Sequence, residues 1–298
     1  MKILVTGGAG FIGTNLIKRL LKDGHKVISV DNYSTGDYKN QQKGCDYYYE
    51  NVSNKYFWCL SDKDECEVTC DHEIEEPDVI FHLAALARIQ PSFKNPQEVF
   101  EVNTLGTQNV LDYARDRNIP VVYAGSSSTH GDHYANPYTF TKWQGELLCE
   151  MYNKVFNLPT TICRFYNVYG PHQILDGAYA AVIGIFESQY ISGKTLTVTG
   201  DGEQRRDFTH VDDIIDGLVK CATNMDVASG KIFELGRGTN HSIIEITEMF
   251  GQEEVEYLPK RPGEMRVTLC ESLEARELLG WTPKIDIEDY IKSFLKTT

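Results

Sequence analysis

The chain begins with a glycine-rich segment that strongly limits the folds open to it. A short apolar strand, MKILVT, runs into Gly7, Gly10 and Gly13, and an amphipathic segment follows that ends at Gly24. A strand, a glycine loop and a helix in this order are typical of a phosphate cradle. The first glycine permits a tight turn, the second lets the backbone approach a pyrophosphate at the helix N-terminus, and the third lets the helix pack on the strand.

The next strand indicates which dinucleotide the cradle would bind. HKVISVD ends in Asp31, at the spacing where an acidic side chain meets the 2′-hydroxyl of an adenosine ribose. A carboxylate there would repel a 2′-phosphate, so the pattern favours NAD over NADP. A chance acid after a glycine-rich turn is the alternative, and the ordered strand, loop, helix and strand disfavour it. We therefore expect an α/β fold with a Rossmann-type doubly wound parallel sheet.

A tyrosine and a lysine one helical turn apart form the candidate catalytic pair. Asn136 and Pro137 are typical of the cap and first turn of a helix, which places Tyr138 and Lys142 on one face. A free tyrosine has a pKa of about 10, and a neighbouring ammonium favours the phenolate, so Tyr138 could act as a base. Ser126, at the end of an apolar strand, would orient the reacting hydroxyl. Tyr-x-x-x-Lys also occurs by chance on many helices, so this interpretation depends on the rest of the chain.

Composition excludes several classes of partner. The chain has 298 residues, 41% of them hydrophobic, which suffices for one large or two unequal domains. A net charge of −14 without a basic patch argues against nucleic acid, which is a polyanion. There is no apolar run long enough to span a bilayer and no recognisable signal peptide, so we expect no membrane association and a cytoplasmic location.

Two groups of residues could suggest a metal site. The first consists of Cys59, Cys66, Cys70 and His72. The second consists of His130, Asp132 and His133. The first lacks a paired C-x-x-C and has acidic neighbours, and loop hydrogen bonds are the favoured interpretation of the second. We therefore expect no metal, and free thiols rather than a disulfide framework for the eight cysteines.

Patterning divides the chain into two parts. Residues 75–87 read as a buried strand that ends in small side chains, residues 96–117 as a helix, and residues 158–171 as another buried strand. After these, residues 177–190 are helical and residues 193–202 alternate like an exposed strand. We expect an NAD-binding domain over 1–168, to which the chain returns around 208–238, and a smaller α/β substrate domain mainly over 169–298.

The order of motifs resembles that of a known family. GGAGFIG, VDNYSTG, FHLAALA, VNTLGTQNVL, SSS, YTFTK, RFYNVYGP, GDGEQRRDFTHVDD and RPGEMRVT follow one another as in the extended short-chain dehydrogenase/reductases of the NAD-dependent epimerase/dehydratase family. Within it the chain looks most like the UDP-glucose and UDP-N-acetylglucosamine 4-epimerases. The resemblance implies an isomerase that oxidises a UDP-hexose transiently at C4, with bound NAD and a catalytic set of Ser126, Tyr138 and Lys142.

The resemblance also implies binding residues. Those expected at NAD are Gly7, Gly10, Phe11, Ile12, Gly13, Asp31, Asn32, Ser34, Thr35, Gly36, Asn51, Val52, Leu83, Ala84, Ala85, Ala87, Asn103, Tyr138 and Lys142. Those expected at the UDP-sugar are Ser126, Ser127, Asn167, Ala181, Val182, Arg206, Arg261, Glu264 and Thr268. Without the family, surface salt bridges would be the favoured interpretation of the arginines at 205, 206, 261 and 266. The family also implies a homodimer through the helices that contain Asn103 and Tyr138.

Two positions bear on the reaction and the substrate. Relatives that dehydrate or decarboxylate carry an acid shortly after the hydroxyl residue, whereas Ser127 and Ser128 follow Ser126. Thr268 aligns with a position where a small residue admits an N-acetylhexosamine, which favours UDP-GlcNAc and UDP-GalNAc. The loop before Tyr138 is shorter than in relatives, so the pocket could be more open or closed by another segment. A dehydratase, a decarboxylase, a ketosugar reductase and a non-catalytic NAD-binding regulator stay open as alternatives.

Overall fold

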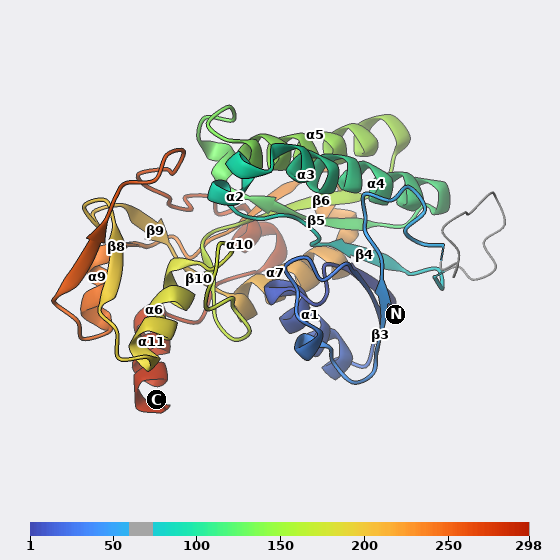
Figure 1. Ribbon diagram of the computed structural model, residues 1–298. Coiled ribbons are helices and arrows are strands. Elements are labelled where there is room, and N and C mark those ends of the chain that lie inside the picture. The colour runs from blue at the N-terminus through green and yellow to red at the C-terminus, as the bar shows by residue number, and fades with distance from the viewer. Residues whose placement is uncertain (60–73, 298) are drawn as a thin grey trace.

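A seven-stranded parallel sheet forms the centre of the molecule (Figure 1). The computed structural model describes residues 1–59 and 74–297. Within these residues the strand order is β11-β6-β5-β4-β1-β2-β3, and every neighbouring pair is parallel. The strands are β1 (Lys2–Thr6), β2 (Lys26–Asp31), β3 (Cys45–Tyr49), β4 (Val79–His82), β5 (Val121–Ser126), β6 (Thr160–Phe165) and β11 (Ile232–Leu235). The predicted Rossmann-type sheet is confirmed.

Helices cover both faces of this sheet, as its apolar strands require. On one face α1 (Phe11–Lys22) packs with α7 (Val211–Thr223), and on the other α4 (Gly106–Arg117) packs with α5 (Pro137–Phe156) (Figure 1). Each face has its own buried apolar cluster. Together α7 and β11 bring the chain back to the large sheet after residue 210.

The predicted helix over 96–117 is interrupted in its middle. It consists of α3 (Pro96–Phe100), a π-helical turn, η2 (Glu101–Leu105), and α4. A π turn inserts an extra residue and often marks a functional position. Asn103 lies in this turn, and its side chain bonds to neighbouring segments rather than facing solvent.

The smaller part of the molecule packs around a third apolar cluster. Its elements are β7 (Val168–Tyr169), α6 (Val182–Ile191), β8 (Leu196–Thr199), β9 (Arg205–Asp207), β10 (Thr209–His210), β12 (Asn240–Ser242), α9 (Ile243–Met249), β13 (Val255–Leu258) and α11 (Ile287–Thr297). The remaining short helices are η1 (Tyr38–Asn40), α2 (Ile89–Lys94), η3 (Ser127–His130), α8 (Met225–Ala228) and α10 (Glu274–Leu279). The predicted helix over 177–190 begins only at Val182, because the carbonyl of Tyr179 is used in a long-range hydrogen bond.

The described residues show no metal cluster. Among them no group of three or more histidine, cysteine, aspartate or glutamate side chains could hold an ion. His130 instead pairs with Glu234 at 2.6 Å, and His133 Nε2 lies 2.8 Å from the carbonyl oxygen of Thr129. Cys66, Cys70 and His72 lie outside the described residues. Free thiols are found at Cys45, Cys149, Cys163, Cys221 and Cys270, whereas Cys59 is disulfide-bonded, so the prediction of free thiols is wrong at that position. No helix in the described part of the chain is both long and apolar enough to cross a membrane.

A buried ion pair joins α5 to β6 directly beneath Ser126. The Glu146 side chain is 2% exposed, and its Oε2 lies 2.7 Å from Arg164 Nη2. The Oε1 atom of Glu146 accepts a hydrogen bond from the backbone N–H of Ser126 at 3.4 Å. Arg164 contacts a second carboxylate, that of Glu234, at 3.4 Å. The end of β5 is therefore held by a charged network under the sheet edge.

We predict that Glu146→Gln lowers the free energy of unfolding by about 3 kcal/mol, because removing one partner leaves the guanidinium of Arg164 buried with weaker compensation. Urea unfolding measures the effect. Glu288→Gln is the matched control, since Glu288 and Lys292 form an exposed pair with 53% and 58% of their side chains accessible, and it should change stability by less than about 0.5 kcal/mol. Equal, small effects of both changes would contradict this role for the buried pair.

Candidate active site

One cavity of about 500 Å³ brings together almost all of the predicted site residues. It runs along the carboxyl edge of the large sheet and between that edge and the smaller part of the molecule. The predicted residues that line it are Gly7, Gly10, Phe11, Ile12, Gly13, Asp31, Asn32, Ser34, Thr35, Asn51, Val52, Leu83, Ala84, Ala85, Ala87, Ser126, Ser127, Tyr138, Lys142, Asn167, Ala181, Val182, Arg206, Arg261, Glu264 and Thr268. Two predicted residues, Gly36 and Asn103, do not line it.

The glycine loop is packed too closely for side chains. Gly7 has φ +76°, its N–H donates to the carbonyl of Val30 at 2.8 Å, and a Cβ on it would lie 2.8 Å from the backbone nitrogen of Ala84. A Cβ on Gly13 would lie 2.2 Å from the carbonyl oxygen of Gly7. Gly10 faces the cavity. The three glycines therefore have the places that a phosphate cradle requires of them.

Asp31 fixes this loop to the second strand. Its Oδ2 accepts a hydrogen bond from the N–H of Ala9 at 2.8 Å, and its Oδ1 accepts one from the N–H of Tyr33 at 2.7 Å. Burial raises the pKa of the carboxyl group, while these backbone donors act in the opposite direction. The carboxylate lines the cavity beside the loop, so its position fits the predicted contact with a ribose.

Gly36 and Asn103 lie behind the cavity wall, and their predicted place at the cofactor stays a prediction. Asn103 is 1% exposed; it accepts a hydrogen bond from the N–H of Leu86 at 2.8 Å and donates one to Thr141 Oγ1 at 3.1 Å. It thus ties the segment after β4 to the helix that carries Lys142. Gly36 packs against the backbone of Ala9, where a Cβ would lie 3.0 Å from the carbonyl carbon.

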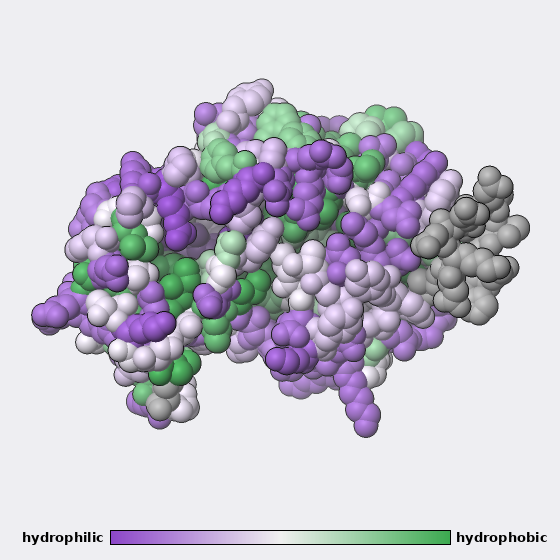
Figure 2. Space-filling model, viewed as in Figure 1, coloured by the Kyte–Doolittle hydropathy of each residue, from purple (hydrophilic) through white to green (hydrophobic). Residues whose placement is uncertain are grey.

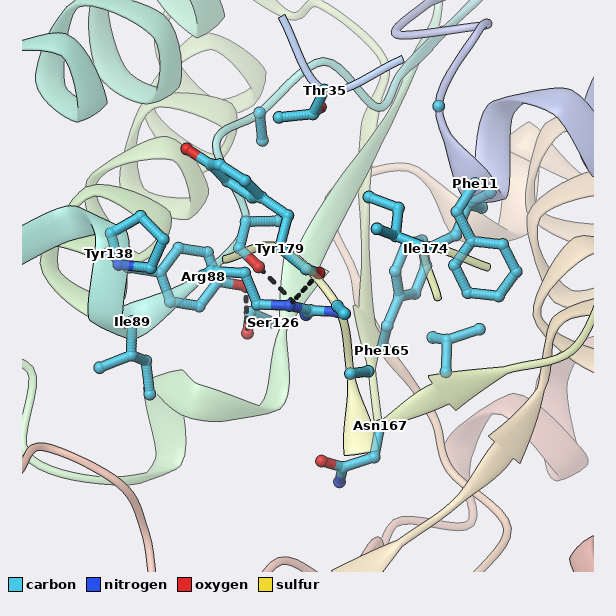
Figure 3. A pocket seen from close by; sticks show the side chains of 18 of the residues that line it. Phe11, Thr35, Arg88, Ile89, Ser126, Tyr138, Phe165, Asn167, Ile174 and Tyr179 are labelled. Atoms are coloured by element: carbon cyan, nitrogen blue, oxygen red, sulfur yellow. Dashed lines mark hydrogen bonds between the residues drawn. The ribbon is translucent and has the colours of Figure 1, made fainter. Parts of the chain in front are cut away.

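Tyr138 and Ser126 meet at one end of the cavity (Figure 3), and Lys142 also lines it. The predicted helix start is present: the Asn136 side chain accepts a hydrogen bond from the N–H of Thr139 at 2.8 Å. Tyr138 donates its hydroxyl proton to Ser126 Oγ, 3.1 Å away. Lys142 is 4% exposed, and its Nζ lies 4.2 Å from the centre of the Tyr123 ring. The geometry therefore suits a proton transfer to or from Tyr138.

The electrostatics differ from the prediction. Burial raises the pKa of Tyr138, and the hydrogen bond to Ser126 and the charge of Arg88 act against that shift. Burial also lowers the pKa of Lys142 to about 8, opposed by Glu146. Lys142 is not among the groups that shift the pKa of Tyr138, so the expectation that Lys142 lowers that pKa stays a prediction. Arg88 is the cation that favours the phenolate, because it lies beside the ring.

The short loop before Tyr138 does not leave the pocket open at that side. Gln90 donates a hydrogen bond to the carbonyl of Pro262 at 2.9 Å, and Asn136 donates one to the carbonyl of Gly263 at 3.3 Å. Gly131 lies against Met265, whose Sδ would be 3.3 Å from a Cβ at that glycine. The segment 262–265 therefore packs against this side of the pocket, and its Glu264 and Met265 line the cavity.

The arginines divide into two kinds. Arg205 pairs with Glu245 at 2.7 Å, and Arg266 pairs with Asp201 at 2.6 Å, as the salt-bridge interpretation predicts. Arg206 and Arg261 instead line the cavity. Arg206 donates hydrogen bonds to the carbonyls of Arg205 and Arg266 at 3.0 and 3.3 Å, and its contact with the carboxylate of Glu264 is long, at 3.9 Å. These two cations are therefore available to an anionic ligand.

Thr268 lies in a tight polar group on the same side of the cavity. Asn167 donates a hydrogen bond to Thr268 Oγ1 at 2.9 Å, and the N–H of Asp207 donates one to the same oxygen at 3.2 Å. Thr268 is 9% exposed. These bonds join three segments at the proposed substrate end of the cavity. They are the turn after β6 with Asn167, the end of β9 with Asp207, and the stretch after Glu264 with Thr268.

Sequence reasoning missed several lining residues, of which Arg88, Ser128 and Tyr179 matter most. Ser128 Oγ lies 2.9 Å from Ser126 Oγ. Arg88 Nε donates a hydrogen bond to the carbonyl of Tyr179 at 2.7 Å, and Nη1 donates one to the carbonyl of Ala87 at 3.2 Å (Figure 3). The available signal for Arg88 was its position directly after the small residues that end the β4 segment.

The cavity residues fit a bound dinucleotide. The close approach at Gly7 and Gly13 leaves bare backbone at the N-terminus of α1, and Asp31 and Asn32 line the wall at the end of β2. Ala84 and Ala85 keep the floor beside Tyr138 free of large side chains. This combination can hold a pyrophosphate, an adenosine ribose and a flat ring in sequence along the sheet edge.

Comparison with known proteins agrees with this geometry. Residues 3–236 match the model of the NAD dependent epimerase/dehydratase family. A UDP-glucose 4-epimerase of Mycolicibacterium smegmatis is 33% identical, over 98% of this chain and 96% of its own. The structure of a Thermotoga maritima UDP-glucose 4-epimerase with UDP-glucose has a TM-score of 0.89 at 28% identity, covering 100% of this chain and 99% of the other.

The structure of a third similar protein contains a different nucleotide sugar. The UDP-glucuronic acid 4-epimerase of Bacillus cereus, in complex with UDP-glucuronic acid and NAD, has a TM-score of 0.84 at 28% identity and covers 100% of this chain and 99% of the other. These proteins are named for the same type of reaction, a 4-epimerisation, but they differ in substrate. The chain therefore belongs to the NAD dependent epimerase/dehydratase family, and it is an NAD-using enzyme of the nucleotide-sugar 4-epimerase class.

Proposed function

We propose that the protein interconverts the C4 epimers of a UDP-hexose, with UDP-GlcNAc and UDP-GalNAc as the preferred pair and UDP-Glc and UDP-Gal also accepted. The observation that carries the proposal is the hydrogen bond between Tyr138 and Ser126, made inside a cavity that also contains the glycine loop and two available arginines. The family of UDP-sugar 4-epimerases supports the reaction type.

The proposed chemistry is a transient oxidation at C4. Tyr138 takes the proton of the 4-hydroxyl and later returns a proton to the 4-keto oxygen, while Ser126 holds that oxygen in place. NAD, when bound, supplies the hydride acceptor and donor. The 4-keto sugar turns over in the pocket before the hydride returns to its other face. Lys142, one helical turn after Tyr138 on α5, would hold the ribose of the cofactor.

The charges around Tyr138 support its role as a base. Burial alone would keep the phenol protonated, since a buried anion is disfavoured. Arg88 acts against this, and the Ser126 hydrogen bond does so as well. Because the cation and the hydroxyl come from different segments, the base depends on the folded cavity rather than on the Tyr-x-x-x-Lys spacing alone.

The remaining site residues are assigned by the two halves of the cavity. Residues 1–168, with 208–238, would bind NAD, and the rest of the chain mainly the nucleotide sugar. Arg206 and Arg261 would bind the diphosphate, because arginine forms paired hydrogen bonds with phosphate oxygens. Asn167 would assist them, and Glu264 would accept a hydrogen bond from the uridine ribose.

The direct test uses purified protein with no added cofactor, incubated separately with UDP-GlcNAc and UDP-Glc and followed by proton NMR of the anomeric signals. New UDP-GalNAc or UDP-Gal signals at constant total sugar support the proposal. A net loss of water or carbon dioxide would favour a dehydratase or decarboxylase, and a requirement for added NAD(P)H would favour a reductase. Bound NAD without any turnover would favour the non-catalytic regulator.

We predict that Tyr138→Phe lowers kcat by about 10²–10⁴-fold, because it removes the group that accepts the proton. Binding of UDP, measured by calorimetry on the NAD-loaded protein, should stay within about threefold. Tyr134→Phe is a matched control, since Tyr134 is 76% exposed, and it should leave kcat unchanged. Turnover near wild type in Tyr138→Phe would sink the assignment of the base.

We predict that Thr268→Tyr lowers kcat/KM for UDP-GlcNAc by more than about tenfold while UDP-Glc is less affected, because a ring at this position fills space that an acetamido group needs. Thr268→Ser keeps the hydroxyl that binds Asn167 and Asp207, and it should retain both activities. Equal losses with both sugars in Thr268→Tyr would show that this position does not select the substrate.

We also propose a cytoplasmic homodimer, with α3, η2 and α5 at the interface. These elements present exposed apolar side chains, which are Phe100, Leu105, Leu147, Met151 and Val155. Figure 2 shows hydrophobic surface over α5 at the top of the view. Light scattering should give twice the chain mass of 33.8 kDa, and Leu147→Glu should give a monomer. A monomeric mass of the unmodified protein would refute the dimer.

A further inference from the structure

Arg88 lines the catalytic end of the cavity, and the proposed function assigns no part of the substrate or the cofactor to it. Four cations line the cavity in the described part of the chain, namely Arg88, Lys142, Arg206 and Arg261. Lys142 is assigned to the cofactor and the other two arginines to the diphosphate. Arg88 instead lies beside Tyr138 and Ser126, where the sugar ring has to react (Figure 3).

The guanidinium of Arg88 is fixed in place but only partly used. A guanidinium has five N–H donors. One N–H, on Nε, bonds to the carbonyl of Tyr179, and one on Nη1 bonds to the carbonyl of Ala87. These two bonds set the plane of the group. The other N–H groups, at the Nη1 and Nη2 end, have no protein acceptor among the described residues, and this end is the fork that fits a carboxylate.

The charge of Arg88 lacks a carboxylate partner among the described residues. The titratable group that acts on it there is Tyr138, and burial lowers the pKa of the guanidinium. A half-buried cation without a counter-ion is less favourable than a paired one, and a neutral hydroxyl on a ligand would compensate it only in part. By contrast Arg164, which is half-buried beneath Ser126, has two carboxylates. A ligand that brings its own anion would complete the site at Arg88.

We propose that Arg88 forms a subsite for a carboxylate carried by the sugar of the substrate, so that acidic UDP-sugars bind better than their neutral counterparts. The inference rests on the proposed function and refines its substrate class: Thr268 concerns the acetamido group, and Arg88 concerns an acidic substituent. Two positions of the carboxylate are tested, C6 of the ring and an ether substituent at C3, because Arg88 lines the cavity together with both Tyr138 and Tyr179.

The experiment compares two matched pairs of ligands on the NAD-loaded protein. UDP-glucuronic acid and UDP-Glc differ only at C6, and UDP-N-acetylmuramic acid and UDP-GlcNAc differ only at the C3 substituent. Calorimetry gives Kd for each ligand, and NMR gives turnover. We expect the acidic member of at least one pair to bind about tenfold or more tightly, and that pair identifies the position of the carboxylate.

Substitutions of Arg88 distinguish recognition of a carboxylate from a general contribution to ligand binding. Arg88→Gln should remove the preference, weakening the acidic ligand at least about tenfold and the neutral one by less than about threefold, while Arg88→Lys should retain part of it. Arg261→Gln is the comparison, since loss of a diphosphate contact should weaken all four ligands alike. In Arg88→Gln the pH profile of kcat with the neutral sugar should move to higher pH, because the charge of Arg88 favours the Tyr138 phenolate.

Two results would overturn the inference. One is an unmodified protein with no preference in either pair. The other is an equal loss of affinity for neutral and acidic ligands in Arg88→Gln, which would limit Arg88 to its effect on Tyr138 and to general binding. Failure of the proposed function looks different: no UDP-sugar is epimerised, whereas the binding preference can still be measured.

Discussion

The close packing of the glycine loop between β4 and α1 is the constraint on which the rest of the structure depends. Gly7 and Gly13 have no room for a Cβ, because the backbone of Ala84 and the carbonyl of Gly7 lie within 3 Å of where it would be. β1 and β4 are neighbours although a long segment separates them in sequence. Their ends form the crevice where ligands of open α/β sheets bind, and the cavity lies there.

The catalytic end of the cavity is stabilised by a buried ion pair and by the hydrogen bonds of one buried asparagine. Glu146 and Arg164 join α5 to β6 under Ser126, and Asn103 joins the segment after β4 to α5. These buried polar groups are all paired, as groups of this kind need to be. Tyr138 and Ser126 therefore come from a helix and a strand whose relative position is set by several independent contacts, which suits a site that has to hold a reacting oxygen in place.

Sequence reasoning reached the parts of the structure that depend on local pattern. The glycine spacing, Asp31 and the capped helix that starts at Pro137 are short-range signals, and the cavity contains all of them. The π turn at Asn103 was not predicted, because its helical periodicity continues on both sides. The late start of α6 was missed for a similar reason, since the hydrogen bond from Arg88 to Tyr179 joins segments 91 residues apart.

The electrostatics of the site were the least predictable part. The spacing of Tyr138 and Lys142 suggested one cation acting on one phenol, but burial dominates both groups, and the cation beside the ring comes from another segment. Burial of a particular side chain depends on the assembled cavity, and no pattern in the sequence reports it. For the same reason Arg88 could be noticed in the sequence but not assigned to the pocket.

The central claim is that C4 is oxidised and then reduced within one pocket. The most direct measurement uses UDP-Glc and UDP-GlcNAc deuterated at C4, in ordinary water, with the product analysed by NMR and mass spectrometry. The account predicts that the epimerised sugar keeps its deuterium, because the same hydride is taken and returned, and that turnover is slower than with the unlabelled sugar. Replacement of the deuterium by solvent hydrogen would contradict it, since the C4 hydrogen would then leave as a proton.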